Sequence, residues 1–119
     1  MAVVDDVLHL GSELERSYPV YVRNRLKFRV GQIVYVAFSL DERELGFAFP
    51  KEQREALIAA EPATFSLPST SDLRFNWIHC ELAALTPSEA REHVVDAWRM
   101  VVPQKLARAY DLVHPDGPG

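Results

Sequence analysis

Four cationic side chains occupy alternate positions in one short segment, and their spacing is the most direct hint of chemistry in the chain. They are Arg23, Arg25, Lys27 and Arg29. In a β-strand, alternate side chains share one face at intervals of about 7 Å. Phosphates follow one another at a comparable interval along an extended nucleic-acid strand. With Tyr35 and Trp77, whose rings offer surface for stacking bases, these cations form a candidate site for DNA or another nucleic acid.

The charge around this row of cations is distributed unevenly. The chain has 13 Lys and Arg against 17 Asp and Glu, a net charge of −4. Residues 16–40 contain five of the cations and no acid. An acidic protein repels polyanions as a whole, but this distribution permits a basic surface on an acidic body. The alternative is an exposed strand face whose cations are solvated or pair with acids of neighbouring strands; the candidate acids are Asp41, Glu42, Glu44 and Glu81.

No arrangement of residues indicates catalysis. His79 and Cys80 are neighbours on a predicted strand, so they point to opposite faces and cannot act as a pair. Cys80 shares its face with Ile78 and Leu82, which favours a buried thiol. The chain also lacks a glycine-rich phosphate loop and a Gly-x-Ser-x-Gly turn. We therefore expect a non-enzymatic protein with no catalytic residues and no cofactor.

Metal and membrane partners are also not expected. The four histidines have no ligand spacing, and Cys80 is the single cysteine. No apolar run reaches the roughly 18 residues that a membrane span requires, and the N-terminal residues 1–10 lack the basic start of a signal peptide. One unpaired cysteine fits a reducing compartment. These features favour a cytoplasmic protein.

Hydrophobic periodicity predicts the elements that position these residues. Period-two patterns favour strands, helical spacing favours helices, and Thr86-Pro87-Ser88-Glu89 is typical of a capping box at a helix start. We predict helices at 2–10 (ending at Gly11), 51–60, 87–101 and 104–113, strands at 20–30 (open to a break near Asn24-Arg25), 33–40, 45–49 and 75–82, and a frayed tail at 114–119. The order predicts an α+β fold, with one domain over residues 1–119. It is a two-layer sandwich with helices on one face of an antiparallel sheet.

The two tryptophans are expected in different surroundings. Trp98 stands at helical spacing from Val94 and Val101, which is typical of core packing. Trp77 lies on the strand face opposite Ile78, and that face is open in a two-layer fold. Trp77 and His79 are therefore expected to line a groove with the loop at 66–74. A protein-interaction or regulatory module that uses this surface and the Pro103 junction, without nucleic acid, is the second functional interpretation.

Four stretches of the sequence carry a resemblance to a known family. They are FRVGQIVYVAF at 28–38, EALIAAEPATF at 55–65, NWIHCEL at 76–82 and AWRMVVPQKLARAY at 97–110. In these places the chain resembles the MmcQ/YjbR family, which has a CyaY-like (frataxin-like) fold. The resemblance covers residues 20–110 and implies a DNA-binding protein. Two positions depart from the family pattern: Leu10-Gly11 lacks the usual following proline, and Gln32 stands where many members have lysine.

Overall fold

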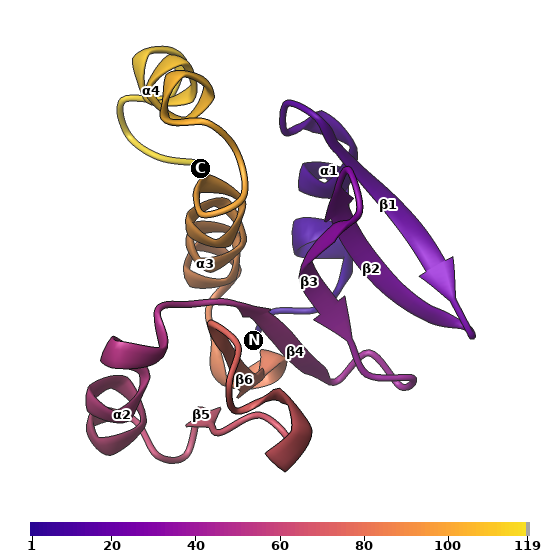
Figure 1. The fold of residues 1–119 in the computed structure, drawn as a ribbon, viewed down its shortest axis with the longest axis vertical. Coiled ribbons are helices and arrows are strands. Elements are labelled where there is room, and N and C mark those ends of the chain that lie inside the picture. Colours follow the sequence, from indigo (N-terminus) through magenta and orange to yellow (C-terminus); the bar gives the residue numbers. More distant parts are fainter. Residues whose placement is uncertain (119) are drawn as a thin grey trace.

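A six-stranded antiparallel sheet in the order β1-β2-β3-β4-β6-β5 forms the centre of the protein. The computed structural model describes residues 1–118. Figure 1 shows β1 and β2 at one end of the sheet and α2 near the other. The strands are β1 (Ser17–Val22), β2 (Arg25–Val30), β3 (Ile33–Phe38), β4 (Glu44–Ala48), β5 (Phe65–Ser66) and β6 (Trp77–Glu81); the helices are α1 (Asp5–Glu13), α2 (Lys51–Ala60), α3 (Pro87–Arg99) and α4 (Gln104–Val113). The predicted α+β fold is confirmed.

The segment predicted as a strand at 20–30, open to a break near Asn24-Arg25, is a hairpin of β1 and β2. Arg23 and Asn24 form its two-residue turn and have positive φ angles of 52° and 66°. Two central residues with positive φ match the right-handed twist of the flanking strands. The pairing sets Val20 opposite Lys27 and Val22 opposite Arg25. Paired residues share a face, so these valines lie on the cationic face. The simple alternation along 20–30 had predicted them on the core face.

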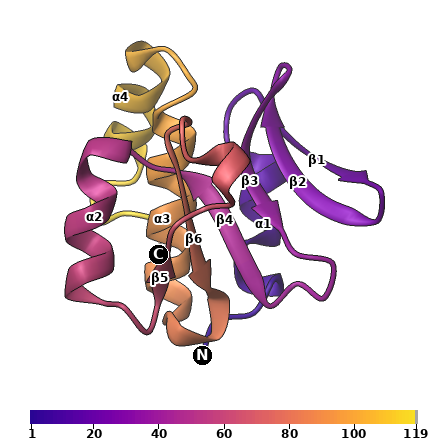
Figure 2. The same cartoon turned by 60° about the horizontal axis from the view of Figure 1, so that its bottom comes forward.

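The core lies on the face of the sheet that α1 and α3 cover (Figure 2). Phe28, Val36, Phe47 and Ile78 are buried there, with Trp98 of α3 against them. The Trp98 indole Nε1 donates a hydrogen bond to the Glu15 carbonyl at 2.9 Å. The core assignment of Trp98 is therefore correct.

Gly11 does not end the first helix, as its position had suggested, but lies inside it. A Cβ at Gly11 would stand 2.6 Å from Cε1 of Phe28. The glycine therefore lets α1 approach the aromatic ring on β2 more closely than any side chain permits. Close packing explains this glycine, and the helix continues to Glu13.

The two C-terminal helices begin where the sequence predicted. At α3, the Thr86 hydroxyl accepts from the Glu89 amide at 3.1 Å, and the Glu89 carboxylate accepts from the Thr86 amide at 2.9 Å. This capping box confirms the start of the helix. Helix α4 follows Pro103 and packs the Tyr110 ring against Trp98, with ring centroids 5.6 Å apart. Within residues 1–118, no helix is both long and apolar enough to cross a bilayer.

Candidate ligand-binding groove

The open face of the sheet is hollowed into a groove of about 720 Å³. One cross-strand row explains the hollow. Lys27 pairs with Ala37, Ala37 with Gly46, and Gly46 with His79. The two middle residues have almost no side chain, whereas the outer two have long ones. The centre of the sheet is therefore the floor of the groove, and the side chains of β2 and β6 are its walls. We call this feature the sheet groove.

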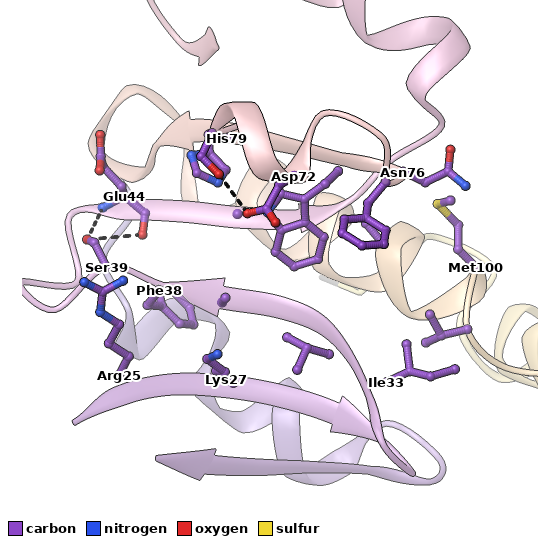
Figure 3. A pocket seen from close by; sticks show the side chains of 18 residues that line it. Arg25, Lys27, Ile33, Phe38, Ser39, Glu44, Asp72, Asn76, His79 and Met100 are labelled. Atoms are coloured by element: carbon purple, nitrogen blue, oxygen red, sulfur yellow. Dashed lines mark hydrogen bonds between the residues drawn. The ribbon is translucent and has the colours of Figure 1, made fainter. Parts of the chain in front are cut away.

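The two ends of the sheet groove differ in polarity, as Figure 3 shows. Arg25, Ser39 and Glu44 lie at one end. The Ser39 hydroxyl accepts a hydrogen bond from the Glu44 amide at 3.0 Å. Ile33 and Met100 lie at the other end, with 54% and 41% of their surface exposed. A ligand that fills the groove would meet charged groups at one end and apolar side chains at the other.

The indole of Trp77 belongs to the β6 wall and covers the Gly46 side of the groove floor. A Cβ at Gly46 would stand 2.7 Å from Nε1 of Trp77 and 3.1 Å from Cδ2 of His79. Only glycine leaves room for the ring in this position. Trp77, His79 and residues of the loop after β5 line the same groove. The sequence had placed these residues together, and the structure agrees.

Arg54 of α2 fixes the loop that carries the aromatic wall. Its side chain is buried, and its guanidinium donates to three main-chain carbonyls, those of Leu73 at 2.5 Å, Phe75 at 3.0 Å and Trp77 at 3.1 Å. A planar cation with several donors suits such a set of carbonyls. Sequence reasoning missed Arg54, because nothing in its helix marks it as different from the exposed charged residues around it.

The cations of the candidate site are held in different ways. Arg25 and Lys27 line the sheet groove. Arg29 follows them on β2 and is half-buried, with a buried Nε that has no hydrogen-bond partner. Arg23 lies in the hairpin turn, so its predicted place on the strand face is corrected. Across the described residues 1–118, none of the four forms an ion pair.

The acids that were expected as pairing partners are occupied elsewhere or stand apart. Asp41 accepts hydrogen bonds from the Ser39 hydroxyl at 2.8 Å and the Arg43 amide at 3.1 Å. These hydrogen bonds lower the pKa of Asp41 below its ordinary value. Glu44 lines the groove, and its backbone lies opposite that of Glu81 in the ladder between β4 and β6. The cationic face is thus not neutralised by direct contacts.

Tyr35 is not available for stacking, which corrects its assignment to the site. The ring is fully buried, and its hydroxyl is hydrogen-bonded to Ser17 at 2.5 Å. Burial raises the pKa of Tyr35 to about 12. The cause is a β-bulge: two steps along β3, from Val36 to Val34, match one step along β2. The extra residue is Tyr35, so it turns into the core together with Val36.

The thiol of Cys80 does not have the properties of a catalytic nucleophile. Cys80 is buried, and burial raises the pKa of its thiol to about 12. The thiolate, which is the reactive form, is therefore scarce at neutral pH. In the part of the chain that the structure describes, no cluster of three His, Cys, Asp or Glu side chains is suited to hold a metal ion.

Comparison with known proteins agrees with this fold. The family model for YjbR matches residues 12–100. This chain belongs to the YjbR family. It is also similar to the crystal structure of Deinococcus radiodurans protein DR2400, described by a DUF419 domain, with a TM-score of 0.73 and 20% identity over 95% of this chain and 88% of that one. At this identity the likeness shows the fold. No curated protein matches the chain.

The family match includes nearly the whole sheet groove. It runs from α1 to just beyond α3, so it contains both walls, the floor and the loop that Arg54 holds. Val101 is the one lining residue that falls outside it. The groove is therefore part of the YjbR domain itself.

Proposed function

We propose that this protein is a non-enzymatic binding domain whose sheet groove binds nucleic acid. One observation carries the proposal: the cations Arg25 and Lys27, which form no ion pair in residues 1–118, line the same groove as the Trp77 indole. Cations that contact phosphates, combined with an aromatic ring that stacks on bases, are the usual means of binding nucleic acid without reading its sequence.

The charge of the hairpin supports the same proposal. All charged residues of β1, β2 and their turn are cations, in a protein whose net charge is −4. Arg23, at the exposed turn, and Arg29, farther along β2, extend the positive surface beyond the groove. An isolated patch of this kind attracts phosphate locally although the protein as a whole repels it.

A fluorescence anisotropy titration with labelled oligonucleotides tests the proposal. The double variant Arg25→Gln/Lys27→Gln should bind more weakly than wild type, whatever the nucleotide sequence. The slope of the logarithm of its binding constant against the logarithm of the salt concentration should be shallower by about 0.7 to 0.9 for each phosphate contact removed. The matched control is Lys105→Gln/Arg108→Gln, because both residues are exposed on α4 and the charge change is the same. If wild type binds no oligonucleotide at low salt, or if both variants weaken binding equally, the proposal is wrong.

A protein partner is the second candidate, and the apolar end of the groove favours it. Ile33 and Met100 at that end, with Phe75 on the loop, are exposed by 54%, 41% and 50%. Exposed apolar side chains that gather in one hollow are typical of interaction surfaces. Peptides selected on wild type should then lose their affinity for Ile33→Glu, whereas Arg25→Gln/Lys27→Gln should still bind them. The opposite pattern would exclude this candidate.

A further inference from the structure

We infer that the sheet groove takes a single strand, with its phosphates along β2 and its bases turned across the floor toward Trp77. The inference rests on the proposed function and names the form of nucleic acid. Three features carry it: the width of the groove, the difference between its two walls, and the fixed position of the aromatic wall.

The width of the groove excludes a duplex from its interior. From β2 to β6 there are three strand spacings, a distance of about 14 Å between backbones. The side chains of Lys27 and Trp77 extend inward from both sides. The volume of about 720 Å³ is that of a pocket for one compact ligand. A whole duplex is broader than its major groove, which alone is about 12 Å wide. The side chains narrow the space between the two walls below about 14 Å, so a duplex would touch only the rim.

The two walls differ in the same way as the two sides of a single strand. The β2 wall carries Arg25 and Lys27, whereas the opposite wall carries Trp77 and is extended by Phe75. A single strand has phosphates along one side and aromatic bases along the other. The acids Glu44 and Asp72 lie on the side away from β2 (Figure 3). They therefore lie off the path of the phosphates, where their charge opposes binding least.

The aromatic wall is already in place before any ligand binds. Arg54 fixes the carbonyls of Phe75 and Trp77, and the Asn76 side chain accepts from the Lys51 amide at 3.1 Å. The floor below the indole is a glycine. A base that stacks on Trp77 would therefore not have to order the loop first, which lowers the entropic cost of binding.

The experiment compares dT12, rU12 and a 12-base-pair DNA duplex by fluorescence anisotropy with wild type and three variants. Wild type should bind the single strands at least tenfold more tightly than the duplex. Trp77→Leu should weaken single-strand binding roughly five- to hundredfold, the effect of one stacked base, and should leave its salt dependence unchanged. Phe75→Leu is a second test, because Phe75 is half-exposed and its loss should not disturb folding. Tyr21→Leu, an exposed aromatic outside the groove, is the control.

Each outcome has a defined meaning. Loss of affinity in Trp77→Leu and Phe75→Leu but not in Tyr21→Leu supports the inference. A preference between dT12 and rU12 also supports it and identifies DNA or RNA as the source of the strand. A duplex that binds as tightly as dT12, or single-strand binding that both groove variants leave unchanged, overturns the inference but leaves the proposed function intact. Failure of wild type to bind any of the three probes overturns both.

Discussion

Replacing Gly46 with alanine tests whether the indole of Trp77 rests on the groove floor. The added Cβ would stand 2.7 Å from Nε1 and 3.0 Å from Cε2 of Trp77. One of the two must move, because real Cβ atoms do not approach other atoms so closely. Forcing a methyl group into a packed site costs about 1–3 kcal/mol. Replacing glycine with alanine returns about 0.4–1 kcal/mol, since the unfolded chain loses freedom.

The expected net result is a loss of about 0.5–2 kcal/mol in the free energy of unfolding. Urea titration followed by circular dichroism measures this loss directly. At this chain length, each 1 kcal/mol also lowers the melting temperature by about 4 °C. Trp77 emission should change as well, whereas Trp98 is buried in the core away from the substitution.

A double-mutant cycle with Trp77→Leu separates the clash with the indole from other effects. In the Trp77→Leu background, Gly46→Ala should cost clearly less than in wild type, because the indole is gone and only the contact with Cδ2 of His79 at 3.1 Å remains. Gly11→Ala is the control: its Cβ would meet Phe28, so its cost should be the same in both backgrounds. An equal cost of Gly46→Ala with and without the indole would refute the packing proposed for the floor.

Three further substitutions test other parts of the fold. Arg54→Leu should cost about 2–4 kcal/mol, because three loop carbonyls lose a charged donor; a change in urea midpoint below that of an exposed control such as Glu55→Leu would contradict this. Thr86→Ala should cost about 1 kcal/mol by removing the helix cap, and an unchanged midpoint would show that the cap contributes nothing. Burial lowers the pKa of His93 below its ordinary 6.5, so the unfolded state takes up the proton first and stability should fall as the pH drops below about 6.5; His93→Gln should flatten that dependence.

Local patterns in the sequence predicted most of the elements correctly. The capping box gave the start of α3, and the period-two segments gave β3, β4 and β6. A break near Asn24-Arg25 was considered, but the hairpin turn at Arg23-Asn24 was not predicted, because the dipeptide contains no glycine, although asparagine accepts positive φ. The two residues of β5 were missed because so short a strand exists only through pairing with β6. Errors thus arose where tertiary contacts and not local preference determine the backbone.

In the candidate site, too, local patterns predicted some positions correctly and tertiary contacts changed others. Trp77, His79, Arg25 and Lys27 line the groove where alternation had placed them on one open face. Tyr35 was misplaced because a bulge changes the alternation, and a bulge depends on register between strands. One signal was present but unused: Gly46 lies inside a strand, where glycine often marks the close approach of another group. That group is the Trp77 indole.

The acidic body of the protein sets how the groove should respond to salt. At 0.01 M salt, charges interact over about 30 Å, which is close to the 34 × 32 × 29 Å extent of the molecule. At this range, an approaching polyanion would be repelled by the surplus of acids outside residues 16–40 while it is attracted by the cations of β2. At 0.15 M salt the range falls to about 8 Å, so only groups near the groove still act.

Added salt therefore weakens the repulsion by distant acids before it weakens the contacts to Arg25 and Lys27. The affinity of wild type should accordingly fall less between 0.01 M and 0.05 M than between 0.05 M and 0.2 M. Titrations at these three concentrations measure the curvature of the logarithm of the binding constant plotted against the logarithm of the salt concentration. A straight line through all three points would show that the acidic body has no influence on binding.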